Sequence, residues 1–306
     1  MLSISKDWFM KTLPACAIIF LMIGAAMFLN NTEIILPEVS ALAIGSLVYQ
    51  NPAWLARPFY LFLLPSLTAI GGFLINQLAI DQAAKLIMVL ALVILVLTIF
   101  KSALAPAFAT GLLPVITHAG SMMFVYSVVV LTLLLYACIR FFYKYLPTTE
   151  LVKSPGRQHR WLYFAFLSVW ILVCRAKGCM MMAAIPPVVV VGYESMHKDT
   201  YPVGVLGKQI ICLVAAALLG TASLYLFKNL LLATLVDFVA ITALFSIVRF
   251  KLTPAYAMSL LPMVLPGTSH AYFSLWVLLM CIVIFGFVWV YKNISFSAVL
   301  PQAEAN

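Results

Sequence analysis

The chain has 306 residues, of which 65% are hydrophobic and 9% charged, and its mean hydropathy is +1.12. A water-soluble domain carries about 25% charged residues, so this composition excludes a cytosolic enzyme and a nucleic-acid-binding module. The apolar residues occur in blocks of about 16 to 24, the length of a helix that crosses a bilayer. We therefore expect an all-α integral membrane protein.

Twelve apolar segments, separated by polar residues, proline or glycine, are expected to enter or cross the membrane. The first six are 13–30, 34–49, 59–80, 86–100, 102–117 and 122–142. The second six are 161–174, 179–193, 203–227, 230–248, 252–266 and 272–291. The second and fifth segments of each set are short, and whether they cross fully or are re-entrant stays open.

The positive charges predict how these segments are oriented. The chain has 18 Lys and Arg against 9 Asp and Glu, a net charge of +9. If the N-terminus is cytoplasmic and all segments cross, 14 of the 18 cations lie at inner ends and 4 at outer ends. This is the asymmetry that the positive-inside rule requires. We expect cytoplasmic N- and C-termini and a place in the plasma membrane, or in bacteria the inner membrane.

The two sets of segments resemble each other in sequence. LAPAFATGLLP at 104–114 and LTPAYAMSLLP at 252–262 are 148 residues apart. The same offset pairs Lys101 with Arg249, and it pairs two patterns of small residues, Thr68 with Gly72 and Ala216 with Gly220. Such spacing lets membrane helices approach closely. We expect two parallel six-helix repeats, 1–142 and 161–306, joined by a basic cytoplasmic linker at 143–160, with a short tail at the C-terminus.

Each set of segments has the same order of features: a short second segment with proline, a third segment with glycine, and a basic residue before a fifth segment rich in proline and alanine. This order resembles the HPP family of integral membrane proteins. In that family the fifth segment reads as a basic residue followed by HPPAGATALLPVL. Here Ala105-Pro106-Ala107 and Thr253-Pro254-Ala255 occupy the place of the His-Pro-Pro motif. Plant members are associated with nitrite transport, and the resemblance implies a small-solute transporter.

Two carboxylates lie inside apolar segments, where a charge costs about 2.5–3.5 kcal/mol on insertion scales. Asp237 lies in the middle of the tenth segment and Glu38 near the start of the second. Neither has an acidic counterpart 148 residues away, where Val89 and Pro186 stand. Unmatched acids in a repeated scaffold are typical of a coupling-ion or proton site; a structural polar contact, or an interfacial acid for Glu38, is the alternative.

The fifth segments are the second candidate site. Proline removes a backbone donor and disrupts a helix, so these segments should be kinked or discontinuous at Pro106, Pro114, Pro254 and Pro262. Lys101 and Arg249 stand just before them. A broken helix start beside a cation can bind an anion, although both cations can equally be interfacial anchors.

His118 and His270 follow the fifth segments and could act as proton-linked switches or simply be solvated. The six cysteines form neither a Cys-x-x-Cys pair nor a Cys/His cluster, so we expect no disulfide, metal or cofactor. There is no Gly-rich phosphate loop and no Ser/His/Asp signature, so we expect no enzyme activity.

The sequence therefore predicts a transporter or permease for a small, anionic solute, coupled to an ion or a proton. Its expected partners are the lipid bilayer and a small solute or ion, without nucleic acid. A non-transporting accessory or assembly subunit of a larger complex is the alternative from another class, and a passive channel is a third. A homo-oligomer and a separate partner subunit both stay open.

Overall fold

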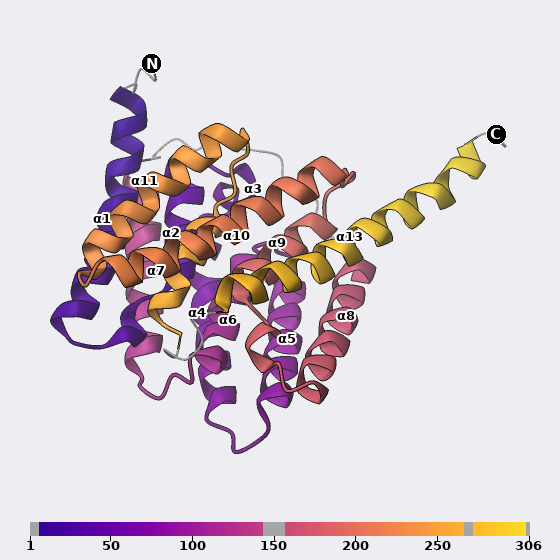
Figure 1. The fold of residues 1–306 in the computed structure, drawn as a ribbon, viewed down its shortest axis with the longest axis horizontal. Helices are drawn as coiled ribbons and strands as arrows, with labels where there is room; N and C mark the ends of the chain where they lie inside the picture. Colours follow the sequence, from indigo (N-terminus) through magenta and orange to yellow (C-terminus); the bar gives the residue numbers. More distant parts are fainter. Residues whose placement is uncertain (1–5, 143–156, 266–271, 304–306) are drawn as a thin grey trace.

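The computed structural model describes residues 6–142, 157–265 and 272–303. Every regular element within these ranges is helical, and they contain no strand. Figure 1 shows the helices, with the N-terminal end of the chain at the upper left and the C-terminal end at the upper right. The predicted all-α class is confirmed for the part of the chain that the structure covers.

The first half of the chain contains seven α-helices and two short turns of other helix types. They are α1 (Lys6–Phe28), η1 (Thr32–Ile34), α2 (Pro37–Ala43), η2 (Ile44–Val48), α3 (Pro52–Leu55), α4 (Tyr60–Asn76), α5 (Gln82–Ile99), α6 (Pro106–Ile116) and α7 (Met123–Phe142). Of the two turns, η1 is a 3-10 helix and η2 is a π-helix that continues α2.

The second half contains a similar series. It consists of α8 (Arg157–Ala176), η3 (Met180–Met182), α9 (Pro186–Met196), α10 (Val203–Leu226), α11 (Leu230–Val248), α12 (Pro254–Leu260), η4 (Leu261–Met263) and α13 (Phe273–Ala303). Both η3 and η4 are 3-10 helices. The predicted linker, 143–160, falls outside the described residues except for 157–160, which form the first turn of α8.

Six of the described helices are long and apolar enough to cross a membrane: α1, α5, α7, α10, α11 and α13. Two more, α4 and α6, are apolar but shorter. Large apolar side chains such as Phe28, Tyr126 and Ile247 are exposed on the outer faces of these helices. An apolar surface of this kind needs lipid around it, so the chain is a membrane protein.

The predicted segments agree best with the long helices. The segment predicted at 230–248 coincides with α11, whereas the one at 34–49 is divided among η1, α2 and η2. The last helix, α13, continues past the predicted end at 291 to Ala303. Hydropathy indicates which residues prefer lipid, but it does not indicate where the hydrogen-bonded helix ends. The predicted segments and the observed helices therefore differ at their ends.

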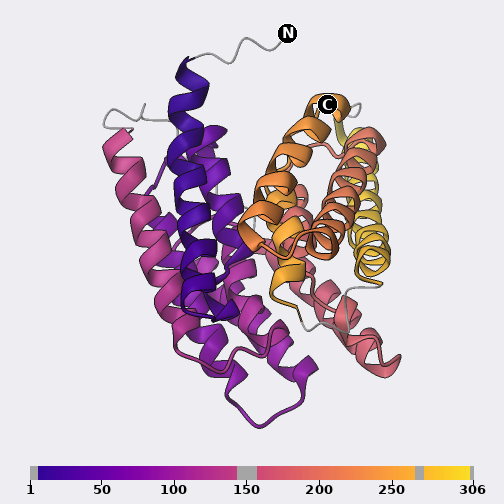
Figure 2. The same ribbon diagram turned by 60° about the vertical axis from the view of Figure 1, so that its left-hand side comes forward.

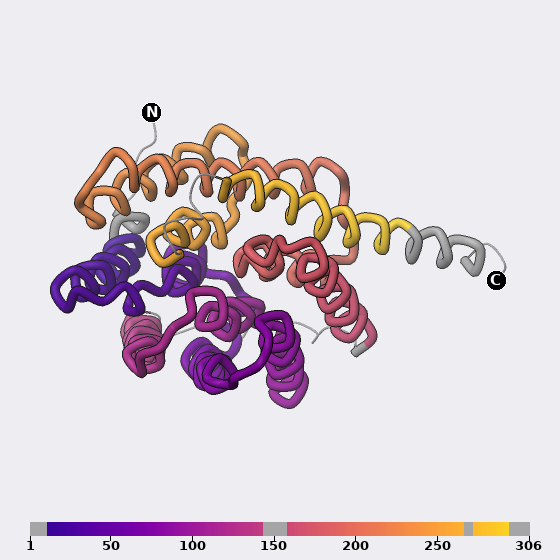
Figure 3. Tube along the Cα trace, turned by 60° about the horizontal axis from the view of Figure 1, so that its bottom comes forward, coloured from indigo at the N-terminus to yellow at the C-terminus, as the bar shows by residue number. Residues whose placement is uncertain are grey.

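The two halves pack against each other through their opening helices. Helices α1 and α2 pack against α11 and α12 of the second half, while α8 and α9 pack against α5 and α6 of the first. Figure 2 shows the indigo-to-magenta helices beside the orange-to-yellow ones, and in Figure 3 the two groups form separate layers. This packing buries α2, α6, α9 and α12.

Candidate functional site

Four short helices meet at the centre of the molecule, and we call them the central ring: α2, α6, α9 and α12. Within it, α2 packs against α12 and α6, and α9 packs against the same two helices. Each helix begins with a proline at its first turn, the position where a missing N–H is tolerated. Nearly every residue of the four helices is buried.

The ring helices are too short to cross a bilayer. The 11 residues of α6, at about 1.5 Å each, cover about 16 Å of a hydrocarbon core about 30 Å thick. Their end groups therefore lie inside the protein. Within a membrane, irregular backbone is tolerated only where protein surrounds it or where it lines a cavity.

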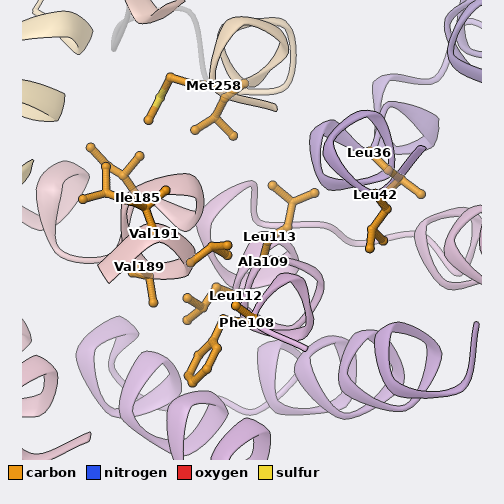
Figure 4. Close-up of a cluster of buried hydrophobic side chains, with 14 of the residues drawn as sticks. Leu36, Leu42, Phe108, Ala109, Leu112, Leu113, Ile185, Val189, Val191 and Met258 are labelled. Carbon is orange, nitrogen blue, oxygen red and sulfur yellow. The ribbon is translucent and has the colours of Figure 1, made fainter. Parts of the chain in front are cut away.

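Most side chains of the ring helices are apolar. Figure 4 shows a cluster of buried hydrophobic side chains from these helices and from the residues before two of them, among them Leu42, Leu113, Val191 and Met258. The buried hydroxyl groups nearby bond within the protein: Ser40 and Ser46 donate to carbonyls of their own helix, and Thr68 and Thr110 share a 2.7 Å hydrogen bond. The ring is thus tightly packed and largely apolar, with the Glu38 carboxyl group and the Tyr193 hydroxyl as its buried polar exceptions.

The prediction that the third segments approach their neighbours closely is confirmed at both glycines. A Cβ added to Gly72 of α4 would overlap the carbonyl oxygen of Gly111 in α6. A Cβ added to Gly220 of α10 would overlap the carbonyl oxygen of Ser259 in α12 in the same way. These contacts press a long helix directly onto the backbone of a ring helix.

Asp237 is buried in α11 with only 1% of its surface exposed. Neither of its carboxylate oxygens has a hydrogen-bond partner in the ranges that the structure covers. The hydroxyl of Ser223 on α10 is close enough to interact with the carboxylate, but it donates to the carbonyl oxygen of Gly220 at 3.1 Å. A buried acid without partners is costly as a charge, so this carboxyl group is placed to hold a proton or a cation.

Glu38 is the second residue of α2 and is 2% exposed. Its carboxylate interacts with its own backbone N–H, while Oε1 has no hydrogen-bond partner among the described groups. An acid in the first turn of a helix is stabilised by the helix dipole. Glu38 is therefore buried in the first turn of a ring helix.

Lys101 and Arg249 do not point into the ring, because both side chains are exposed. Each follows a long helix and has a left-handed backbone, with φ of 47° and 52° respectively. The next residues repeat the arrangement, since Ser102 N–H donates to Leu97 O at 2.9 Å and Phe250 N–H to Phe245 O at 3.3 Å. Such bonds terminate helices, so the two cations occupy helix ends at the surface.

The four prolines have two different roles. Pro106 and Pro254 start α6 and α12. Pro114 lies inside α6, which continues for two more residues to Ile116. Pro262 lies in η4, where the chain changes from an α-helix to a 3-10 helix. The helix type therefore changes at the second proline of the later segment, whereas α6 continues past Pro114 as an α-helix.

Two histidines were candidates for proton-linked switches. His118 is exposed and has a φ of 55°, and His270 lies outside the described residues. In the regions that the structure describes, no group of three or more His, Cys, Asp or Glu is arranged to hold a metal ion.

A buried basic cluster was not recognised from the sequence. Arg160, in the first turn of α8, is only 3% exposed. Its Nη1 donates to Thr98 Oγ1 at 3.2 Å and its Nη2 to Ser102 O at 3.1 Å, both at the junction of α5 and α6. The remaining nitrogen, Nε, is buried and has no partner within the described ranges.

Two residues at the end of α9 lie close to Arg160. The guanidinium charge acts on the hydroxyl of Tyr193 and on the ring of His197. Both the Tyr193 hydroxyl and His197 Nε2 are buried without a partner in the described part of the chain. Burial lowers the pKa of His197 to about 4, and the charges of Arg160 and Lys292 act in the same direction.

The sequence contained one signal for this cluster. Arg160 has no basic counterpart 148 residues earlier, where Thr12 stands. The absence of a counterpart also singled out Glu38 and Asp237, but Arg160 was interpreted only as part of the basic linker. Its burial depends on contacts with residues about sixty positions away, which no local pattern reveals.

The long apolar helices and their exposed apolar side chains define the class, a helical integral membrane protein. No family model, no curated protein and no solved structure matches the chain.

Proposed function

We propose that this chain is a transporter for a small, anionic solute, built from two parallel six-helix repeats and coupled to an ion or a proton through Asp237. The observation that carries the proposal is the central ring of four half-length helices. Helix ends at membrane depth are tolerated only where protein encloses them or where they line a cavity, and discontinuous helices frame the substrate sites of many transporters.

Element positions support a duplicated architecture. Helices α5 and α11 begin 148 residues apart, as do α6 and α12, and so do η1 and η3. Backbone details follow the same offset: Asn30 and Gly178 both have positive φ, as Lys101 and Arg249 do. A shared offset at this level is what a repeat would produce, and each repeat would contribute two helices to the ring.

Contacts between connecting segments support the proposed topology of twelve membrane segments. At the end proposed as cytoplasmic, Arg57 donates to Phe100 O at 3.4 Å. At the opposite end, Arg175 and Asp81 form an ion pair at 3.2 Å, and Glu33 accepts from Gly120 N–H at 2.8 Å. Each contact joins segments that the topology assigns to one side, and none of these three joins opposite sides.

The anionic character of the solute rests on charge. Lys101 and Arg249 each precede a ring helix by five residues, and the net charge is +9. The resemblance to the HPP family favours the same class of solute, with the reservation that the His-Pro-Pro histidine is replaced in both halves.

The experiment that tests the proposal is uptake of radiolabelled small anions by proteoliposomes that contain the purified chain. Nitrite, nitrate and chloride are suitable probes, with and without an imposed pH gradient. Uptake that saturates, exceeds that of empty liposomes and responds to the gradient is the expected result. If none of these anions is taken up, either with or without the pH gradient, the proposal is contradicted.

A second function is favoured by the many buried hydrophobic side chains of the ring helices, some of which Figure 4 shows. An assembly or accessory subunit needs no polar path through the bilayer. Purification from native membranes distinguishes the two functions, because a stoichiometric partner together with no flux by the isolated chain would favour the accessory subunit.

A further inference from the structure

We propose that Arg160, Tyr193 and His197 form a binding site for a small oxyanion, such as a phosphate group, at the junction of α8, α9 and the α5–α6 turn. The site uses the C-terminal end of one ring helix, α9, and includes neither Asp237 nor Glu38. Anion binding here does not require that the chain transport anything, so the proposal goes beyond the proposed function.

The first argument is the unbalanced charge of Arg160. A guanidinium group stays protonated in proteins, and a buried charge is stable only when it is paired and hydrogen-bonded. Within the described ranges, the one ion pair joins Arg175 and Asp81, far along α8 from Arg160. The two partners of Arg160 are a hydroxyl and a carbonyl, which carry no net charge. An anion is therefore the missing partner.

The second argument is the set of donors. Arg160 Nε–H and the Tyr193 hydroxyl are both buried and donate to no described group. Leaving a buried donor unpaired costs about 1–3 kcal/mol, and two of them beside one uncompensated charge are rare in folded proteins. Both donors are satisfied at once if an oxyanion accepts from them.

His197 contributes a donor only when it is protonated. Its Nδ1 lies 2.6 Å from the carbonyl oxygen of Tyr193, which can only accept, so the ring hydrogen of the neutral form is on Nδ1. Nε2 then presents a lone pair and becomes a donor on protonation. Arg160 and His159 on α8 and Lys292 on α13 disfavour the charged ring. An anion beside it has the opposite effect, so binding should take up a proton.

The surroundings contain two further basic groups, His159 and Lys292, and one acid, Asp199, which interacts with Lys292. His159 lies against Tyr291 of α13, with its Nδ1 2.9 Å from the hydroxyl, and Lys292 follows in the chain. Trp161, 43% exposed, lies next to Arg160 on the outer face of α8. The site is thus near the lipid boundary, and the oxyanion could belong to a dissolved ion or to an anionic lipid headgroup.

The test uses the full chain in nanodiscs of phosphatidylcholine. Two arms separate the two sources of the anion: titration with sodium phosphate, matched in ionic strength with sodium chloride, and replacement of part of the phosphatidylcholine by phosphatidylglycerol. Thermal stability and tryptophan fluorescence are measured in each arm. We expect a saturable increase in Tm in one arm, and the responsive arm identifies the source.

Variants separate binding from folding. Arg160→Gln should weaken anion binding by about tenfold or more, as loss of a hydrogen bond to a charged group does. Tyr193→Phe keeps the ring contacts with Phe108 and Tyr163 and removes only the hydroxyl. It should also weaken binding, yet leave the Tm without anion unchanged or higher, because an unpaired buried group is removed. Arg175→Gln, at the exposed end of α8, is the matched control.

The proposal is overturned if neither arm stabilises the parent beyond its control, or if Arg175→Gln weakens the response as much as Arg160→Gln. It is also overturned if Tyr193→Phe lowers the Tm of the anion-free protein and leaves the anion response intact, because a bound water or structural contact would then account for the hydroxyl.

Discussion

Gly220 of α10 lies directly against the backbone carbonyl oxygen of Ser259 in α12, with no room for a Cβ between them. We expect Gly220→Ala to destabilise the protein by about 1–3 kcal/mol, the usual cost of overpacking, because backbone atoms cannot move aside as a flexible side chain can. Gly72→Ala should have a similar effect at Gly111. Thermal unfolding in detergent measures both.

The chain offers matched glycines as controls. A Cβ at Gly24 in α1 or at Gly286 in α13 meets nothing within 4 Å, and alanine is the better helix former. Gly24→Ala and Gly286→Ala should therefore leave the Tm unchanged or raise it. Equal losses in all four variants would show that the close contacts of α4 and α10 are not special.

Asp237→Asn tests the proposed coupling group. The substitution keeps the shape of the side chain and removes its ability to carry charge, so we expect uptake to lose its dependence on the pH gradient. Asp81→Asn removes an acid at a partly exposed helix end and should leave the dependence intact. Unaltered, still pH-dependent uptake by Asp237→Asn would eliminate the coupling role.

Lys101 and Arg249 combine a charge with an unfavourable backbone conformation. Substitution by glutamine tests the charge, and substitution by glycine tests the backbone conformation. Lys101→Gln and Arg249→Gln should each weaken anion binding if the cations attract the solute. Lys101→Gly should be more stable than Lys101→Gln by about 1 kcal/mol, because glycine adopts a left-handed φ without strain. Binding and Tm are measured on the same preparations. If both Gln variants bind the solute as the parent does, the two cations are interfacial anchors.

His197 should make the fold less stable in acid. Burial lowers its pKa in the folded state to about 4, against an ordinary value of 6.5. Between these values the unfolded chain binds a proton that the folded chain does not, so stability falls as the pH decreases through this window and changes no further below it.

The measurement is the difference in Tm between the parent and His197→Gln from about pH 7 to about pH 4.5. The difference is needed because Glu194, whose pKa burial raises to about 7, has the opposite effect on stability over much of the same range. A parent and a variant that lose stability in parallel would show that His197 is not the group responsible. The experiment is done without phosphate or anionic lipid, since a bound anion would stabilise the protonated ring.

Much of the architecture could be predicted from local patterns. The segment at 230–248 coincides with α11, and the shortness of the second and fifth segments anticipated α2, α6, α9 and α12. The expected anion role of Lys101 and Arg249 was drawn from their position in the chain. Position alone could not indicate that both side chains are exposed, because a residue at a helix end can face either way depending on what packs beside it.

The sequence by itself determined that this is a helical membrane protein with an apolar pattern that recurs at an offset of 148 residues. Hydropathy and helix length act within one segment, so they can be derived without knowing which segments touch. Only the tertiary structure decided which polar groups share a buried environment. Arg160 lies beside Thr98 and Ser102 because α8 packs on α5, and it lies close to His197 because α9 packs on α6. The fate of a charge depends on contacts between distant segments, and those form only when the helices assemble.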